Sequence, residues 1–253
     1  MKVTFLGTGT SQGIPVIACQ CKVCKSTDQR DKRFRSAVMI EQEDKTIVID
    51  TGPDFRQQML VNDVRNLTAI IFTHEHKDHV AGLDDVRAFN FILGREIDVY
   101  AESRVQEALQ REFAYIFSEY QYPGTPKIKM HLIVNKKFEI EGIEILPIRA
   151  MHYELPVFGF RIGNFAYLTD INYIDEQEMK KLNGVKHFVI SALRKEKHIS
   201  HYSLSEALEV IARVNPQHAY LTHLSHQFGL HAEEEPKLPE NVFIAYDGLT
   251  IEV

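Results

Sequence analysis

The segment THEHKDH, residues 73–79, places three imidazoles and two carboxylates within seven residues. It directly follows LTAIIF, an apolar run that is typical of a buried strand. His74 and His76 are two residues apart, so an extended backbone points both side chains to the same side. Asp78 and His79 follow on a loop that can turn toward a second ion. Residues of these types at this spacing predict a site for divalent metal ions.

Other apolar runs of the chain also end in a histidine or an aspartate. LPIRAMH ends at His152, FAYLTD ends at Asp170, and HAYLTHLSH contains His223. Taken singly, each of these three residues better fits a hydrogen-bonded core or turn role. Their shared position after strands makes a metal-binding role equally good, because ligands placed after the strands of a rigid sheet can converge in one cleft. Seven such ligands suit two ions that share a bridging ligand. The candidate metal ligands are His74, His76, Asp78, His79, His152, Asp170 and His223.

The three cysteines of the chain, Cys19, Cys21 and Cys24, lie within six residues of one another. Their odd number and tight spacing favour metal binding over disulfides in a cytoplasmic chain. A closed structural zinc site takes four ligands, and no further cysteine exists to supply the fourth. His226, three residues after His223, is our candidate for that ligand. Three reduced thiols without a metal are the alternative.

Short strands and helices alternate along the chain and must position these residues. Candidate strands are residues 2–6, 36–41, 45–50, 67–72, 97–100, 143–148, 157–162, 165–169, 186–191, 218–222 and 241–245. Candidate helices are residues 54–61, 84–93, 103–117, 175–182 and 203–214. Hairpins are predicted to turn at Glu43-Asp44 and at Gly163-Asn164. Hairpins combined with later strand–helix units predict a mixed α/β architecture of two sheets with outer helices.

One stretch breaks this alternation. Residues 118–130, SEYQYPGTPKIKM, contain two prolines and a glycine and predict an exposed loop or lid. Residues 102–137 carry no motif that we can interpret. No linker divides the chain, so we expect residues 1–253 to form a single domain.

Composition limits the class of protein. The chain has 253 residues, of which 44% are hydrophobic and 25% charged, as in ordinary globular proteins. The apolar part of MKVTFLGTG is too short for a signal-peptide core, and no apolar run approaches a bilayer span, so we expect a cytoplasmic protein away from membranes. The net charge of −6 argues against broad charge-driven binding to nucleic acid.

The pattern H-x-H-x-D-H at residues 74–79, followed by His152, the LTD aspartate and the LTH histidine, resembles the metallo-β-lactamase superfamily over nearly the whole chain. The resemblance implies an αββα four-layer sandwich with a binuclear site at one edge of its two sheets. It also implies which residues hold each ion: His74, His76 and His152 on one, Asp78, His79 and His223 on the other, and Asp170 between them.

Four further motifs refine the resemblance. GTGTSQGIP, CQCKVC and RFRSA are similar to motifs of the cyclic phosphodiesterase of bacterial phosphonate (C–P lyase) metabolism and its relatives, which imply a structural zinc on three cysteines and a late histidine, and a homodimer. DTGPDFRQQ also resembles a cofactor-biosynthesis branch of the superfamily. By resemblance to the superfamily as a whole, Asp50 in IVIDTG matches an early aspartate that supports the ligands; an N-cap or turn role is the alternative.

His201, in HISHYSLSEAL, lies just ahead of a predicted helix, where backbone N–H groups favour phosphate. By resemblance His201 contacts phosphate or acts as the general acid, and a core or capping role is the alternative. His198 is a nearby second candidate for the same catalytic role. Arg33 and Arg35 could bind a terminal phosphate, unless RDKRFR is only a solvated charge run. We therefore take Asp78 and His201 as candidate catalytic residues, and the two arginines with His201 as candidate substrate contacts.

These observations predict a metal-dependent phosphodiesterase. Two divalent ions, manganese or zinc, would activate a bridging hydroxide and leave about one net positive charge for a singly charged diester. The expected substrate is a small or cyclic sugar- or nucleotide-like phosphodiester. The alternatives are a non-catalytic protein that binds phosphate esters and a ribonuclease like the tRNA 3′-end endonuclease. That enzyme usually carries an RNA-gripping insertion, whereas the loop at 118–137 offers only four lysines.

Overall fold

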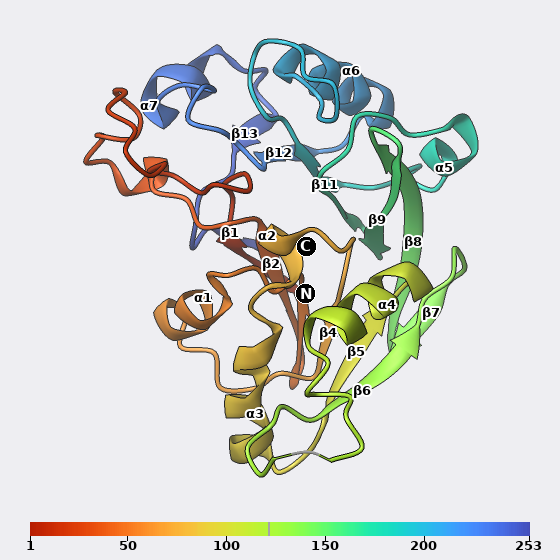
Figure 1. The fold of residues 1–253 in the computed structure, drawn as a ribbon. Coiled ribbons are helices and arrows are strands. Elements are labelled where there is room, and N and C mark those ends of the chain that lie inside the picture. The colour runs from red at the N-terminus through yellow and green to blue at the C-terminus, as the bar shows by residue number, and fades with distance from the viewer. Residues whose placement is uncertain (121) are drawn as a thin grey trace.

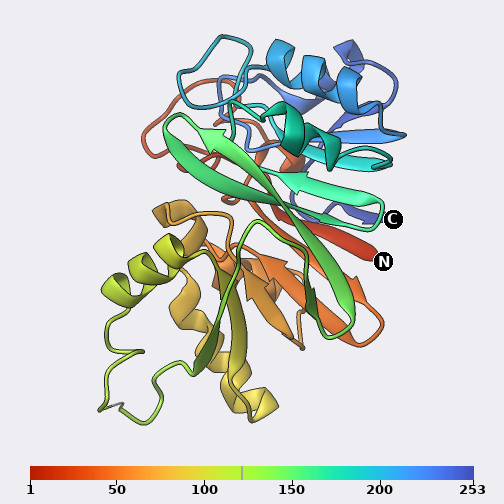
Figure 2. The same ribbon diagram turned by 90° about the vertical axis from the view of Figure 1, so that its right-hand side faces the viewer.

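Two seven-stranded sheets lie face to face, and helices cover the outer face of each sheet (Figures 1 and 2). The computed structural model describes residues 1–120 and 122–253. The order of layers is helix, sheet, sheet, helix, which confirms the αββα sandwich predicted from the sequence.

The first sheet combines a hairpin from the early part of the chain with parallel strands. Its strands, in spatial order, are β14 (Thr250–Glu252), β1 (Lys2–Gly7), β2 (Ala37–Gln42), β3 (Lys45–Ile49), β4 (Ala69–Ile71), β5 (Ile97–Ala101) and β6 (Ile128–Leu132). Pairing is antiparallel from β14 to β3 and parallel from β3 to β6. The β2–β3 hairpin turns at Glu43-Asp44, as predicted.

The second sheet is built in the same way. Its strands, in spatial order, are β13 (Val242–Ile244), β12 (His218–Thr222), β11 (His187–Ser191), β10 (Phe165–Leu168), β9 (Leu155–Ile162), β8 (Ile143–His152) and β7 (Phe138–Ile140). The strands from β10 to β13 are parallel, and β9 runs antiparallel to β8 and to β10. The β9–β10 hairpin turns at Gly163-Asn164, as predicted.

The helices are short and amphipathic. They are α1 (Phe55–Val61), α2 (Lys77–Val80), α3 (Arg87–Leu93), α4 (Ser103–Glu112), α5 (Glu176–Lys180), α6 (Leu204–Val214) and α7 (His231–Glu234), with 3₁₀ turns at Gln29–Asp31, Leu83–Val86 and Glu235–Lys237. A capping box begins α6, in which the Glu206 carboxylate accepts from the Ser203 backbone N–H at 2.9 Å.

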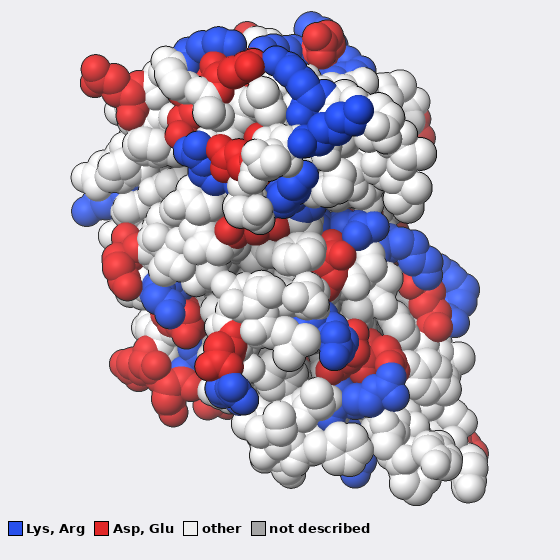
Figure 3. Space-filling view, turned by 90° about the vertical axis from the view of Figure 1, so that its left-hand side faces the viewer, with Lys and Arg blue, Asp and Glu red and all other residues white. Residues whose placement is uncertain are grey.

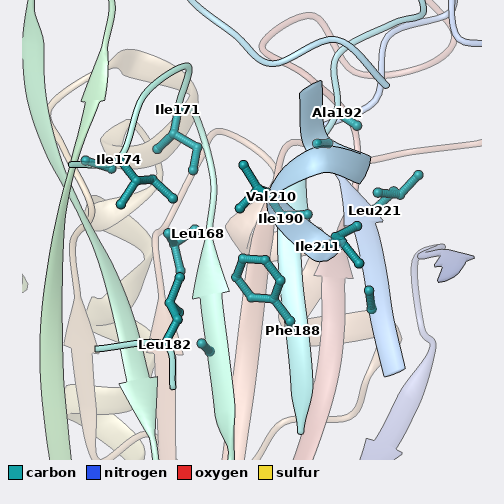
Figure 4. Packing of buried hydrophobic residues seen from close by; sticks show 14 of the residues in the cluster. Leu168, Ile171, Ile174, Leu182, Phe188, Ile190, Ala192, Val210, Ile211 and Leu221 are labelled. Carbon is teal, nitrogen blue, oxygen red and sulfur yellow. The ribbon is translucent and has the colours of Figure 1, made fainter. Parts of the chain in front are cut away.

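Three buried layers hold the sandwich together. One lies between the sheets and includes Phe5, Phe158 and Phe160. A second lies under α1, α3 and α4 on the outer face of the first sheet. The third lies under α5 and α6, where Phe188 and Ile211 belong to one cluster with other hydrophobic residues (Figure 4). Because both faces of each sheet are covered, the central strands are apolar on both sides.

The topology brings the ends of distant strands to one edge. The strands β8, β10, β11 and β12 share one direction, so their carboxyl ends lie together, and those of β3 and β4 lie together in the other sheet. The Phe158 N–H of β9 donates to the Thr73 carbonyl after β4 at 3.1 Å and joins the two groups of strand ends. All the predicted ligand segments therefore meet along one edge of the sandwich.

Several predictions of local structure were wrong. The strands β6, β7 and β14 and the helices α2 and α7 were not predicted. The helix expected at 103–117 ends at Glu112, and the loop expected at 118–130 gives way to β6 at Ile128. Position 121 of that loop lies outside the described residues. None of the described helices is long and apolar enough to cross a membrane.

Candidate active site

Two groups of ligand atoms meet at the shared edge. One group contains His74, His76 and Asp170, and the other contains Asp78, His79, Asp170 and His223. Within each group, one ligand atom from every residue lies within 4.8 Å of the others. Asp170 belongs to both groups, so its carboxylate is the candidate ligand that the two groups share.

The contacts of Asp170 show this shared position directly. Its Oδ2 is 2.9 Å from His79 Nε2 and 3.4 Å from His74 Nε2. Its Oδ1 is 2.7 Å from His223 Nε2. One carboxylate therefore touches histidines of both groups, which come from the ends of strands in different sheets.

His152 completes the ligands that the sequence predicted. Its ring centroid is 5.1 Å from that of His76 and 5.9 Å from that of His74. Its Nδ1 donates to the Ser200 carbonyl at 2.7 Å, so its Nε2 carries the free lone pair. The structure thus brings all seven predicted ligands together.

Buried hydrogen bonds fix the tautomers of two other histidines. Asp50 Oδ1 accepts from the Thr73 N–H at 2.9 Å, and its Oδ2 accepts from the Thr73 hydroxyl at 2.8 Å and from His79 Nδ1 at 2.7 Å. The Thr73 oxygen lies 2.9 Å from His74 Nδ1 and accepts its proton, because the hydroxyl hydrogen is already donated to Asp50. In both rings the protein holds Nδ1, and Nε2 faces Asp170. This is how proteins orient metal-binding histidines.

The backbone at the strand ends is strained. Asp50, Asp170 and His223 have φ values of 68°, 51° and 57°, in the left-handed region that residues with a Cβ rarely adopt. Each of the three directly follows a strand or lies within two residues of its end. A left-handed residue turns the chain sharply, so the side chain is directed out of the sheet edge toward the site.

The electrostatics of the site require added positive charge. Burial alone lowers the pKa of His79 and His223, yet the nearby Asp78 and Asp170 carboxylates outweigh it, raising the pKa of His223 to about 9 and that of His79 well above its usual range. Burial raises the pKa of Asp170, but His223 and His79 hold it well below its ordinary value. Protons on the two imidazoles thus balance buried carboxylates.

The donor set fits divalent metal ions. Burial lowers the pKa of His74 to about 3, so its imidazole is neutral, and its buried Nε2 has no hydrogen-bond partner among the described residues. A buried lone pair beside carboxylates is costly unless a cation accepts it. Neutral imidazoles with carboxylates suit zinc, manganese and similar ions.

His201 lies beside the two ligand groups. Its ring is 4.5 Å from that of His152 and stacks at 5.0 Å on His223, and its Nδ1 is 3.9 Å from Asp170 Oδ1. Burial lowers its pKa to about 3. His198, the competing residue, lies one ring further out at 5.2 Å from His201 and is engaged with Ser200. Of the two, His201 is therefore placed to touch a ligand of the ions.

The structure does not bring Arg33 to the site. Its side chain is only 5% exposed, and it donates to the Thr8 hydroxyl at 2.7 Å and to the Ala245 carbonyl at 2.5 Å. The prediction of a phosphate contact was wrong for this residue, because the sequence pattern RDKRFR does not show which arginine is buried.

Arg35 lies nearer the site but has partners of its own. Its guanidinium bonds Asp54 at 2.9 Å and the Ser11 carbonyl at 3.1 Å, and so ties the glycine-rich loop to the loop after β3. Gly52 on that loop is required for close packing, since a Cβ there would lie 2.1 Å from the Asp78 carbonyl. Arg35 supports the backbone that carries Asp78.

The cysteine cluster closes around His226 as predicted. His226 Nδ1 lies 3.3 Å from the sulfurs of Cys19 and Cys21 and 3.7 Å from that of Cys24. The four ligand atoms lie within 4.8 Å of one another. A backbone hydrogen bond from Cys24 lowers the pKa of Cys21 to about 6, which favours a thiolate. The set has the composition of a closed structural zinc site.

Sequence reasoning missed residues that hold the ligand loops. Glu75, between two ligand histidines, forms an ion pair with Arg104 of α4 at 3.3 Å. Asn172 donates to the Ile199 carbonyl at 3.0 Å and accepts from the Tyr153 N–H at 2.8 Å. Their residue types alone give no signal, because a polar side chain becomes a bridge only when folding brings two segments to it.

A family model described as a beta-lactamase superfamily domain matches residues 45–224, a span that contains both ligand groups. The chain belongs to the metallo-β-lactamase superfamily. This confirms the resemblance read from the H-x-H-x-D-H pattern, and it makes the chain a metal-binding hydrolase of the metallo-β-lactamase fold.

Relatives within the metallo-β-lactamase superfamily differ in their named activities. A crystal structure of a diphosphatase from the PhnP family superposes with a TM-score of 0.93 at 36% identity and covers 100% of this chain and 97% of that one. The octanoyltransferase of Porphyromonas gingivalis is 39% identical over 98% of this chain and 51% of that protein. The ribonuclease Z of Nostoc punctiforme is 25% identical over 64% of this chain and 47% of that protein. The chain spans about half the length of these curated relatives.

Proposed function

We propose that the protein is a binuclear metal-dependent phosphodiesterase that hydrolyses a small or cyclic, sugar- or nucleotide-like phosphodiester. The observation that carries this proposal is the position of Asp170, whose carboxylate contacts both ligand groups. The similarity to a diphosphatase of the PhnP family supports chemistry at phosphorus.

The ligand residues divide between two sites. His74, His76 and His152 would hold one ion, and Asp78, His79 and His223 the other, with Asp170 bridging. When bound, two manganese or zinc ions supply a nucleophile at neutral pH and positive charge for the phosphoryl oxygens. The structural zinc on Cys19, Cys21, Cys24 and His226 would hold residues 14–26 in place.

The chain's own residues select and assist the substrate. The two ligand aspartates only partly neutralise two divalent ions, so the pocket favours a singly charged diester. His201, stacked beside His223 and His152, is placed to contact a phosphoryl oxygen or to give a proton to the leaving oxygen. Because burial lowers its pKa, the donor role requires a bound anion that raises the pKa again.

Hydrolysis of bis(p-nitrophenyl) phosphate tests the proposal. The protein with manganese or zinc should release p-nitrophenolate, and removal of the ions by a chelator should abolish the release. His76→Ala and Asp78→Ala should abolish it as well, because each removes a ligand of one ion. Octanoyl-coenzyme A serves as a comparison substrate in view of the octanoyltransferase relative and should remain intact. A fully metal-loaded protein that cleaves no diester in a broad panel contradicts the proposal.

Two alternatives are resolved with the same preparation. Tight binding of a phosphate ester without turnover would indicate a non-catalytic binding protein. The ribonuclease Z relatives motivate a cleavage assay with precursor tRNA. We expect no cleavage, because the net charge is −6 and acidic and basic side chains are intermixed over the face shown in Figure 3, without a continuous basic stripe.

The setting of the enzyme follows from the same proposal. We infer a cytoplasmic protein that acts on a small-molecule substrate, away from membranes and without a nucleic-acid partner, and that forms a homodimer. The reduced thiols of the cysteine cluster suit that compartment.

A further inference from the structure

Three large apolar side chains are exposed beside the candidate active site. Tyr153, Tyr173 and Ile199 are 53%, 56% and 67% exposed. Tyr153 follows the ligand His152, Tyr173 lies three residues after the bridging Asp170, and Ile199 lies two residues before His201. We refer to these three side chains as the entrance cluster.

Hydrogen bonds join the three segments that carry the entrance cluster. Met151 pairs with Tyr173 through a backbone hydrogen bond of 2.9 Å, and the Asn172 N–H donates to the Met151 carbonyl at 2.8 Å. The Asn172 side chain links the other two segments, since it accepts from the Tyr153 N–H and donates to the Ile199 carbonyl. The entrance cluster therefore stands on one rigid backbone unit.

The same unit carries the active-site residues. His152 Nδ1 donates to the Ser200 carbonyl at 2.7 Å, and the Tyr202 N–H donates to the Ile171 carbonyl at 2.8 Å. In Figure 2 the tip of the β8–β9 hairpin and the loop before α6 lie on the same edge of the molecule as α2. The entrance cluster thus lies within one to three residues of two candidate metal ligands, His152 and Asp170, and of His201, which would contact the phosphate.

Both tyrosine rings of the entrance cluster are more than half exposed. Among the described residues, neither ring stacks on another ring and neither hydroxyl has a hydrogen-bond partner. A buried or structural tyrosine usually has a partner for its hydroxyl. A ring with an apolar face and a wet polar tip is suited to stack on a flat unsaturated group.

We propose that the entrance cluster binds a planar ring, a nucleobase or an aryl group, on the part of the substrate that stays attached to phosphorus. This inference rests on the proposed phosphodiesterase function and adds the class of organic group. The inference depends on where the rings lie. The ions would fix the phosphate, and the two exposed tyrosine rings are carried by the same backbone segments as the candidate ligands His152 and Asp170. A sugar phosphate without a base would leave these rings in water.

Two esters with the same leaving group test the inference. Thymidine 5′-(p-nitrophenyl phosphate) and methyl p-nitrophenyl phosphate both release p-nitrophenolate, so they differ only in the retained group. The wild-type protein should prefer the thymidine ester by about tenfold in kcat/KM, as expected for one base stacked on an aromatic side chain. The double variant Tyr153→Ala/Tyr173→Ala should lose this preference, mainly through a higher KM.

Control variants separate stacking from other roles. Tyr153→Phe/Tyr173→Phe keeps the rings and should keep the preference. Tyr120→Ala removes an exposed tyrosine on the segment after α4 and should also keep it.

Other results of the same assays separate the inference about ring binding from the proposed phosphodiesterase function. Equal use of both esters by the wild-type protein overturns the inference while the phosphodiesterase function stands. If neither ester is cleaved, the phosphodiesterase function fails, and titration calorimetry of metal-loaded protein with thymidine monophosphate and methyl phosphate then tests the same tenfold ratio. A changed oligomeric state of the double Ala variant with an unchanged preference also overturns the inference, because the cluster would then be an interface between copies.

Discussion

Asp50 is the residue whose replacement tests the geometry of the metal site most sharply. It is fully buried and accepts hydrogen bonds from the Thr73 N–H, the Thr73 hydroxyl and His79 Nδ1. Asp50 is not one of the candidate metal ligands. Asp50→Asn therefore changes only the hydrogen bonds that orient His79 directly and His74 through Thr73. The replacement keeps the size of the side chain and removes one acceptor.

Either orientation of the new amide is unfavourable. If the amide nitrogen occupies the Oδ2 position, it donates to His79 Nδ1 and forces the proton onto Nε2, the atom that lies 2.9 Å from Asp170 and would bind the ion. If the amide is flipped, its nitrogen faces the Thr73 N–H, and two buried donors meet. An unsatisfied buried donor costs about 1–3 kcal/mol.

This cost sets the expected effect on metal affinity. Loss of a partner that orients a metal-binding histidine weakens binding by about 10–100-fold, which corresponds to about 1.4–2.7 kcal/mol. The estimate agrees with the cost of an unsatisfied donor. The ion at Asp78, His79 and His223 should be weakened more than the ion at His74, His76 and His152, because His79 loses its acceptor directly.

Elemental analysis during stepwise chelation measures the effect. Asp50→Asn should release one ion at a chelator concentration about 10–100 times lower than the wild type does, and phosphodiester hydrolysis should fall with it. Asp98→Asn is the matched control, since Asp98 pairs with His131 at 2.5 Å outside the ligand groups. If Asp50→Asn retains both ions with wild-type affinity and full activity, the orienting role is refuted.

Three further predictions address the other parts of the site. Asp170→Asn should weaken both ions together, and loss of a single ion in elemental analysis would contradict a bridging role. His226→Ala should lower the zinc content by about one equivalent and lower the Tm, while zinc content equal to the wild type would show that His226 is not a ligand. His223 has its folded-state pKa raised to about 9 from 6.5, so its proton stabilises the metal-free fold fully below pH 6.5, and this stability is lost as the pH rises through 9. Metal ions compete with that proton, and apparent metal affinity should rise over the same window in chelator titrations followed at several pH values.

The grouping of the candidate metal ligands was predictable because their residue types indicate their chemistry. Three histidines and an aspartate within residues 74–79 exclude an ordinary surface strand end, and the fold had only to bring His152, Asp170 and His223 to them. The cysteine cluster was predictable for the same reason, since the chain lacked a fourth thiol. In both cases the sequence names the donor atoms, and the topology supplies the distances.

The residues around the ligands were less predictable, because their roles depend on burial. Arg33 and Arg35 are two positions apart in one basic run, yet one is buried under the Ala245 carbonyl and the other pairs with Asp54. The edge strand β6 was missed for a different reason. The residues of β6, IKMHL, do alternate between apolar and polar side chains, but the two prolines and the glycine at 123–126 predicted a loop that extended to residue 130.

The strained positions help to aim residues of the site from both sheets. In an extended strand, successive side chains point to opposite faces of the sheet. The left-handed backbone at Asp170, His223 and Asp50, which holds the candidate ligand His79, turns the chain sharply at three strand ends. Such a conformation costs about 1–3 kcal/mol per residue and persists only where the surroundings impose it. Here the parallel strands and buried hydrogen bonds impose it, so the rigidity of the sandwich maintains the convergence of its metal ligands.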